Sequence, residues 1–332
     1  MGLGAVYSQA GNPAEVVRVV EVDEPRDPGP GQVLIRVTLF PIHWGDLQAI
    51  QYGYASPSGP VRAGGVEVTG VVEKIGPGVH HVAPGARVSV FPQPGAWAQR
   101  VVADAQFVVP VPDSVSDEVA AQMLGNPITV LMLRREAEKH FTTGYDGVVL
   151  NNAAGGSVGR LLTAELSTHH IATISLVRSA ETAMGLRERF PEVPVVVTNQ
   201  PGWVAAVRDL IGGRTVGAAL DPIGGAISAD LLGLLSAGGT LVVYGRMADE
   251  PIPIHAWALL QNGLTIRTLT IRRWLATTSP EQRASDTKTA VLMAQALSDQ
   301  FDRAAMYPIG ELSDAIRHAT KPGKAGKVLV RA

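Results

Sequence analysis

The sequence predicts a two-domain α/β protein in which a β-rich domain accompanies a doubly wound parallel sheet. From Gly147 onward, runs that favour strands alternate with runs that favour helices, and this alternation is typical of a parallel sheet with helices on both faces. Residues 1 to about 120 instead carry short β-branched runs separated by proline and glycine, which indicates an all-β part. The length of 332 residues also exceeds the usual size of one domain.

The β-rich part ends where the residue pattern changes from strand to helix. At Ser116–Met123 a serine or aspartate cap precedes apolar residues at helical spacing, so a new domain begins near this point. The predicted strands before it cover Val33–Leu39, Val66–Ile75, Arg87–Phe91, Ala98–Val102 and Phe107–Val109.

The alternating part follows a strand, helix, strand order without internal repeats. Its predicted strands cover Val148–Leu150, Ile171–Val177, Val193–Val197, Gly217–Leu220 and Thr240–Tyr244, and its predicted helices cover Val158–His169, a segment from Ala180, Trp203–Ile211 and Ala226–Leu235. The chain closes with a helix through Lys288–Leu297 and a strand at Lys327–Val330.

A glycine-rich turn after the first of these strands predicts a dinucleotide phosphate site. Ala154, Gly156 and Gly159 have the spacing of the dinucleotide fingerprint, with alanine in place of the first glycine. A small residue at 154 lets the chain turn, Gly156 lets the backbone approach a pyrophosphate, and Gly159 lets helix and strand pack closely. The phosphate would bind free N–H groups at the helix N-terminus. The predicted contacts therefore include Gly155, Ser157 and Val158 as well.

The same residues also match a nucleophile elbow, since Gly155–Gly159 has the pattern Gly-x-Ser-x-Gly. A serine hydrolase built on Ser157 would take Asp221 with His255 or His318 as its partners, and an unliganded turn is a further alternative.

The next predicted strand favours the dinucleotide interpretation. Arg178 follows it about 20 residues after the glycines, where an NADP site places an arginine near the 2′-phosphate. We therefore expect NADPH rather than NADH. Ligands of such sheets bind at the carboxyl ends of the strands, which here include Asp221–Gly225 and Gly245–Met247, and Gly245 is predicted to contact the cofactor.

Composition narrows the partners and the location. A net charge of −2 offers no global field for nucleic acid or an anionic membrane, so we expect small molecules or other subunits as partners. The absence of cysteine excludes disulfides, thiolate zinc sites and cysteine nucleophiles. The N-terminus lacks a signal-peptide pattern, and Leu231–Tyr244, the longest apolar stretch, is too short and too interrupted to span a membrane. We therefore expect a cytoplasmic protein.

Several residue strings resemble the medium-chain dehydrogenase/reductase superfamily. They are PGPGQVLIRV from Pro28, GVVEKIGPGV from Gly70, PGARV from Pro84 and GKAGKVL from Gly323. The resemblance runs from about residue 10 to the C-terminus. It implies a GroES-like catalytic domain, expected at 1–121 and 274–332, and a Rossmann dinucleotide-binding domain at 122–273. Lys327 of the last string is expected among the cofactor contacts.

The zinc chemistry of some superfamily members is not expected here. Their catalytic zinc uses a cysteine and the histidine of a Gly-His-Glu motif, whereas this chain has Gly65, Val66 and Glu67 at that motif. His43 falls where the cysteine would be. His43 and Glu67 are too few ligands for a catalytic zinc, which takes three from the protein.

Two segments are similar to the 2-enoyl thioester reductases within the zinc-free branch. The string IHWGDLQAIQYGY from Ile42 is similar to a reductase string whose tyrosine is taken to protonate the substrate, and its register assigns that role to Tyr54. The string GNPIT from Gly125 is similar to one near the nicotinamide, which implies that Asn126 and Thr129 contact the cofactor. Trp44, Tyr52 and Trp274 are expected to line the substrate pocket.

The resemblance implies an NADPH-dependent reductase that transfers hydride to the C=C bond of an α,β-unsaturated carbonyl compound. The alternatives are an NADPH:quinone oxidoreductase of the same fold, because His43-Trp44-Gly45 departs from the reductase string, and an NADPH-binding protein without catalysis. In relatives, edge strands of the nucleotide sheet pair across a two-fold axis. Leu264–Ile271 alternates as such a strand should, so a homodimer is expected.

Overall fold

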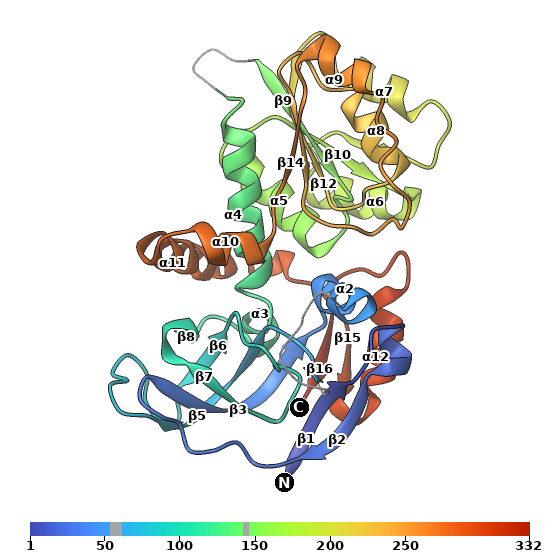
Figure 1. The fold of residues 1–332 in the computed structure, drawn as a ribbon. Helices are drawn as coiled ribbons and strands as arrows, with labels where there is room; N and C mark the ends of the chain where they lie inside the picture. Colours follow the sequence, from blue (N-terminus) through green and yellow to red (C-terminus); the bar gives the residue numbers. More distant parts are fainter. Residues whose placement is uncertain (54–61, 142–145) are drawn as a thin grey trace. The chain divides into compact units, whose positions relative to one another are not determined.

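The computed structural model describes residues 1–53, 62–141 and 146–332, and these form two compact units. The first unit contains Met1–Asn126 and Thr287–Ala332, and the second contains Pro127–Asp286 (Figure 1). The sequence placed the divisions at 121/122 and 273/274. The two units divide inside helices, α4 (Gly125–Glu138) and α11 (Pro280–Ala296).

The first unit is built on a mostly antiparallel sheet with the order β15-β16-β3-β5-β6-β8, and β7 pairs with β3. A smaller sheet has the order β2-β1-β4. The strands are β1 (Gly2–Tyr7), β2 (Arg18–Val22), β3 (Gln32–Pro41), β4 (Arg62–Ala63), β5 (Val68–Ile75), β6 (Arg87–Val90), β7 (Arg100–Asp104), β8 (Val108–Pro110), β15 (Arg303–Pro308) and β16 (Lys327–Arg331). The helices are α1 (Pro13–Val16), α2 (Trp44–Tyr52), α3 (Asp117–Ala120) and α12 (Leu312–Thr320), with short 3-10 helices at Ala105–Phe107, Ser298–Gln300 and Ile309–Glu311.

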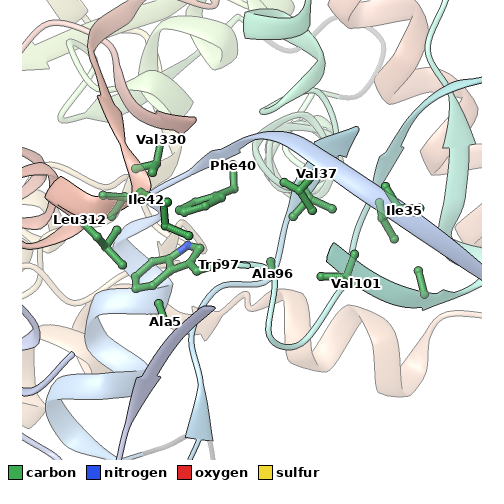
Figure 2. Packing of buried hydrophobic residues seen from close by; sticks show 14 of the residues in the cluster. Ala5, Ile35, Val37, Phe40, Ile42, Ala96, Trp97, Val101, Leu312 and Val330 are labelled. Atoms are coloured by element: carbon green, nitrogen blue, oxygen red, sulfur yellow. The ribbon is translucent and has the colours of Figure 1, made fainter. Parts of the chain in front are cut away.

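Trp97 organises the core of this unit. Its ring stacks on Phe40 with centroids 6.1 Å apart, and its indole N–H donates to the Pro41 carbonyl over 3.3 Å. Figure 2 shows both rings between the end of β3 and the strand and helix that carry Val330 and Leu312. A Cβ on Gly65 would lie 2.3 Å from the indole, so only glycine lets the segment before β5 cross this ring. The indole therefore fixes the backbone that leads to Glu67.

The second unit is a parallel sheet with the order β11-β10-β9-β12-β13-β14. Its strands are β9 (Gly147–Asn152), β10 (Thr173–Val177), β11 (Val195–Val197), β12 (Thr215–Asp221), β13 (Thr240–Val243) and β14 (Thr265–Thr268). The helices are α5 (Ser157–Thr168), α6 (Ala180–Arg189), α7 (Trp203–Ile211), α8 (Ala226–Leu232), α9 (Ala256–Asn262) and α10 (Ile271–Thr277). The order reverses between β9 and β12. Because parallel crossovers are right-handed, α5 and α6 cover one face and α8 the other. The predicted fold class is confirmed.

Some predicted boundaries differ from those observed. The expected strand Leu264–Ile271 is shortened to β14 because the Thr270 side chain accepts from the Arg273 N–H and begins α10 at Ile271. The helix expected at Ala226–Leu235 ends at Leu232. None of the helices in the described part of the chain is long and apolar enough to cross a membrane.

Candidate active site

The glycine-rich turn joins the carboxyl end of β9 to the start of α5. Gly156 is the N-cap of α5 and has no side chain to bond the first N–H groups of the helix. Because the first N–H groups of a helix have no partner within it, this helix N-terminus is suited to an anion. Gly156 is exposed, and Gly155, Ser157 and Val158 are partly buried.

Close packing of helix on strand depends on Gly159. A Cβ at this position would lie 2.5 Å from the Ala153 carbonyl oxygen and 2.6 Å from the Ala154 Cα. The Asn151 side chain, which is fully buried in β9, donates to the Gly159 carbonyl over 2.9 Å and to the Thr163 hydroxyl over 3.0 Å. Backbone packing at Gly159 and the hydrogen bonds of Asn151 therefore hold the start of α5 against β9.

The residue that turns the chain is Ala153 rather than Ala154. Ala153 has a φ of 54°, in the left-handed region that L side chains rarely adopt. Its N–H donates to the Asn152 side chain over 2.9 Å, which supports this conformation. Ala154 is fully buried, and its N–H donates to the Leu176 carbonyl of β10 over 3.0 Å. The small residue at 154 thus serves packing.

A buried carboxylate links the two strands at which the sheet order reverses. The Asn152 side chain at the end of β9 donates to Asp221 at the end of β12 over 2.8 Å. Asp221 is fully buried and also accepts from the Ile223 N–H over 2.8 Å, the Gly224 N–H over 3.2 Å and the Ser228 hydroxyl. This network fixes the carboxyl edge of the sheet, where ligands of such folds bind.

Gly245 lies at the same edge, just after β13. A Cβ there would lie 2.6 Å from the Pro222 carbonyl oxygen, so the backbone after β13 approaches the backbone after β12 closely. An open pocket of about 380 Å³ adjoins Gly245, Gly224 and Gly225. Burial, with the nearby Asp221 carboxylate, raises the pKa of Tyr244 beside this pocket, so its hydroxyl keeps its proton.

Arg178 follows β10 directly and is exposed. Since β10 pairs with β9 in parallel, with Leu176 opposite Asn152, Arg178 lies at the same edge of the sheet as the glycine turn. Ser179 caps α6 by accepting from the Thr182 N–H, which fixes the backbone next to Arg178.

The hydrolase partners of Ser157 are engaged elsewhere. In the described residues, the Asp221 carboxylate bonds Asn152, Ser228 and backbone N–H groups. His255 accepts from the Trp257 N–H at the start of α9, and His318 pairs with the Tyr307 hydroxyl over 3.0 Å.

In the first unit, a buried polar cluster connects three distant segments. Glu67 has a fully buried side chain, and its Oε2 lies 2.6 Å from His43 Nε2. Its Oε1 accepts from the N–H groups of Leu124 and Gly125 over 2.9 and 3.2 Å. Lys327 Nζ lies 3.3 Å from His43 Nδ1. The sequence named each of these side chains but did not predict that they meet. An acidic residue next to the turn at Gly64-Gly65 was the available signal.

Two further side chains of this unit bury polar atoms that have no partner in the described part of the chain. Asp46 accepts from the His43 N–H over 3.1 Å through Oδ2, while its Oδ1 is buried and unpaired within the described chain. Burial raises the pKa of Asp46 to about 6, although His43 and Lys327 act in the opposite direction. Asn126 Nδ2 is likewise buried without a partner among these residues. The described residues contain no group of three or more His, Asp or Glu side chains arranged to hold a metal ion.

The remaining predicted residues are distributed over both units. Trp44 and Tyr52 begin and end α2, and the Tyr52 hydroxyl accepts from Gln51 over 3.4 Å. Thr129 lies one helical turn beyond Asn126 on α4, and is partly buried. Trp274 is buried in the second unit, and its indole N–H donates to Asp286 over 2.7 Å. Tyr54 lies outside the described residues.

Comparison with known proteins gives a family match and relatives over most of the chain. The Alcohol dehydrogenase GroES-like domain family matches residues 29–113. The mitochondrial enoyl-[acyl-carrier-protein] reductase of Xenopus tropicalis is 27% identical over 92% of this chain and 86% of its own length. That of Bos taurus is 28% identical over 83% of this chain and 74% of its own length.

Two solved structures share the fold over almost the whole chain. A mycobacterial protein in complex with NADPH superposes with a TM-score of 0.86 at 25% identity and covers 100% of both chains. The Escherichia coli quinone oxidoreductase in complex with NADPH has a TM-score of 0.86 at 21% identity and covers 99% of this chain and 100% of its own. With the sheet order, the glycine turn and the GroES-like match, these similarities support the medium-chain dehydrogenase/reductase superfamily, in the branch of the enoyl reductases and quinone reductases.

Proposed function

We propose that the protein is an NADPH-dependent oxidoreductase that reduces the C=C bond of an α,β-unsaturated carbonyl compound, with an enoyl thioester as the first candidate. The observation that carries this proposal is the N-terminus of α5, which has no side-chain cap, at the same sheet edge as an exposed arginine directly after the next strand. Support for the acceptor comes from the Xenopus tropicalis enoyl reductase, which is similar over 92% of the chain.

The residues of the second unit fit a dinucleotide phosphate group. The backbone N–H groups of Gly155, Ser157 and Val158 would bind the pyrophosphate, and Gly156, whose own N–H donates to the Ala153 carbonyl over 2.9 Å, would let it approach the backbone. Ala154 and Gly159 would support this turn by packing, and Gly245, which lets the backbone after β13 approach Pro222, is a further proposed cofactor contact at the same edge of the sheet. Arg178 would pair with the 2′-phosphate, because a guanidinium matches phosphate oxygens in a bidentate manner. Asn126 and Lys327 of the first unit are proposed cofactor contacts, and Thr129 of the second unit is a third.

When bound, the cofactor supplies the hydride, and the chain supplies position and protons. Tyr54 is the proposed donor to the α-carbon of the acceptor, since a tyrosine hydroxyl, with a reference pKa near 10, is protonated at neutral pH. Trp44 and Tyr52 on α2, and Trp274, are the proposed pocket residues. Trp274 would act there through its ring, because its N–H is already bonded to Asp286.

The acceptor is tested by following NADPH oxidation with an enoyl-CoA, a simple enone and a quinone. We expect turnover with the enoyl-CoA to exceed turnover with the quinone. Tyr54→Phe should lower the rate on the order of 100-fold to 10,000-fold and leave NADPH binding unchanged. The reverse order of acceptors would favour the alternative, a quinone oxidoreductase, which the fold shared with the Escherichia coli enzyme keeps open. NADPH binding without turnover would indicate a non-catalytic role.

The cofactor preference is tested at Arg178. Arg178→Ala should raise the NADPH dissociation constant about 10- to 100-fold, as expected for loss of a hydrogen bond between charged groups. The dissociation constant for NADH, which lacks the 2′-phosphate, should hardly change. Arg208→Ala, at another exposed arginine of the second unit, is the control. Equal weakening of both cofactors would remove Arg178 from the 2′-phosphate site.

We also propose a homodimer formed through the second unit. All four residues of β14 are exposed, and β14 stands at the end of the sheet order with β13 as its neighbour. On α9, Trp257 and Leu260 are 63% and 75% exposed, which is unusual for large apolar side chains. Leu260→Glu should therefore convert a dimer into a monomer in light scattering after size-exclusion chromatography. A wild-type monomer would contradict the proposal.

The cytoplasmic location stays a prediction, since the similar enoyl reductases are mitochondrial.

A further inference from the structure

In the cluster of Glu67, His43 and Lys327, the hydrogen bonds of the two partners define which ring nitrogen of His43 carries the proton. Glu67 Oε1 receives two backbone N–H groups, so Oε2 is the acceptor for the imidazole 2.6 Å away. A carboxylate accepts only, and therefore His43 Nε2 carries a proton. The other ring nitrogen faces an ammonium, which donates only. His43 Nδ1 must then carry a lone pair. Both partners thus require the same neutral tautomer.

The lysine at the end of this chain of bonds is fixed at its backbone as well. Lys327 begins β16, whose pairing with β3 sets Leu329 opposite Pro41 and Val330 opposite Phe40. Its N–H donates to the Asp302 carbonyl over 2.8 Å. Before it, Gly326 has a φ of 95°, and a Cβ there would lie 2.5 Å from the same carbonyl oxygen. The Lys327 side chain is therefore fixed at its backbone and at its ammonium group.

The cluster is partly open to solvent and belongs to a unit that buries further polar groups. The side chain of His43 is 12% exposed, and Lys327 is partly buried. Asp46 Oδ1 and Asn126 Nδ2, in the same unit, are buried without partners in the described chain. Glu67 binds the N–H groups that precede Asn126, and His43 precedes the helix of Trp44 and Tyr52. An unusual concentration of charge therefore borders residues that the proposed function assigns to the cofactor and the acceptor.

We propose that Lys327 is a catalytic residue of the reductase, with His43 and Glu67 as its positioning residues. This inference rests on the proposed function and moves Lys327 from the cofactor contacts to the acceptor. Hydride addition to the β-carbon shifts the π electrons of the C=C bond toward the carbonyl, so negative charge develops on the carbonyl oxygen. The Lys327 ammonium donates a hydrogen bond to that oxygen and keeps its own proton. The proton on the α-carbon comes from Tyr54. A fixed donor stabilises this charge without reorganising during the reaction.

Substitutions along the chain of bonds separate the two kinds of role. Lys327→Met keeps the length of the side chain and removes the donor, so kcat at saturating NADPH should fall about 100- to 1,000-fold. Lys327→Arg keeps a donor and should recover part of that loss. His43→Asn and Glu67→Gln should lower kcat about 10- to 100-fold, the effect of one lost hydrogen bond to a charged group. The NADPH dissociation constant should match that of the wild type in all four variants.

Two matched controls lie outside the cluster. Lys321→Met and His80→Asn change exposed residues of the same unit by the same chemistry and should leave kcat unchanged. Thermal unfolding of every variant distinguishes loss of the fold from loss of the donor. A Lys327→Met variant that is folded, binds NADPH weakly and retains wild-type kcat would show Lys327 to be a cofactor contact and overturn the inference. If the wild type reduces none of the acceptors, the proposed function fails, and the catalytic role of Lys327 fails with it.

The tautomer of His43 gives a readout that does not depend on turnover. In protein labelled with ¹⁵N at histidine, the signal that His43→Asn removes identifies His43. It should show a protonated Nε2 and an unprotonated Nδ1 at neutral pH. Glu67→Gln should release this preference, because a side-chain amide can present either a donor or an acceptor. A wild-type His43 protonated at Nδ1 would contradict the arrangement even if the protein is an active reductase.

Discussion

Gly159 offers a sharp test of how the glycine turn is built. Alanine at a helix interior position is normally favoured over glycine by about 1 kcal/mol. At position 159, however, the new Cβ would lie 2.5 Å from the Ala153 carbonyl oxygen and 2.6 Å from the Ala154 Cα. Both are backbone atoms of the turn, so neither can move away as a flexible side chain would.

The expected cost follows from these contacts. Overpacking a well-packed site by one methyl group costs about 1–3 kcal/mol, and contacts with backbone justify the upper part of that range. After the gain in helix propensity is subtracted, Gly159→Ala should lower the free energy of unfolding by about 2 kcal/mol. In a domain of this size each 1 kcal/mol shifts Tm by roughly 2–4 °C, so the second unit should melt several degrees lower.

The matched control is Gly185→Ala in α6. A Cβ at Gly185 would meet no atom of the described residues within 4 Å, and Gly185 is exposed. This substitution should therefore raise the unfolding midpoint of the second unit in a thermal or urea experiment followed by circular dichroism. Gly159→Ala should also weaken NADPH binding, because helix and strand must separate at the turn. A Gly159→Ala midpoint as high as that of Gly185→Ala would refute the packing argument.

Three further predictions concern the turn and the buried carboxylates. Ala153→Gly relieves the left-handed φ and should not lower the free energy of unfolding. Ala154→Gly should lower it by about 1 kcal/mol, because packing is lost and the unfolded backbone gains entropy. Thermal unfolding that ranks the two variants in the opposite order would contradict the assignment of the turn to Ala153. The pKa of Asp46 rises from 3.8 to about 6 on folding, so the folded protein binds this proton more tightly and the free energy of unfolding should fall by about 3 kcal/mol as the pH rises through this interval. Asp46→Asn should lack that part of the pH dependence in urea titrations, and an unchanged pH profile would refute its origin in Asp46. Asp286→Ala removes the hydrogen-bond acceptor of Arg135 and of the Trp274 indole, and should lower the free energy of unfolding by about 3 kcal/mol. A decrease of only about 0.5 kcal/mol, as for a surface substitution, would show that these donors find other partners.

The decrease in the free energy of unfolding at acid pH should also depend on Asp286. Burial opposes ionisation of its carboxyl, yet hydrogen bonds from Arg135, Trp274 and Gln282 outweigh burial and lower its pKa. A lowered pKa means that the unfolded chain takes up the proton first as the pH falls. The stabilisation by Asp286 is therefore complete above its unfolded pKa and is lost toward acid, opposite in sign to the contribution of Asp46.

The sequence alone predicted the features that depend on residues close together in the chain. The alternation of apolar runs predicted β9, α5 and β10, because side-chain periodicity is a property of a short segment. The spacing of Gly156 and Gly159 predicted a turn suited to phosphate for the same reason. The exact turning residue was missed. Ala153 adopts a left-handed φ through a bond to the Asn152 side chain, and no local pattern marks that conformation.

Only the tertiary structure decided which polar groups meet. Asn152 reaches Asp221, 69 residues away, because the sheet order places β12 beside β9. His43 lies 24 residues from Glu67 and 284 from Lys327 along the chain, and the pairing of β16 with β3 brings the last of these to the cluster. Periodicity and motif spacing predict contacts only between residues that are close in the sequence. Strand pairing also brings together residues that are hundreds of positions apart, and the sequence pattern does not show which strands pair. The sequence thus determined the fold class and the position of the glycine turn, and the register of the sheets determined the buried Glu67–His43–Lys327 cluster.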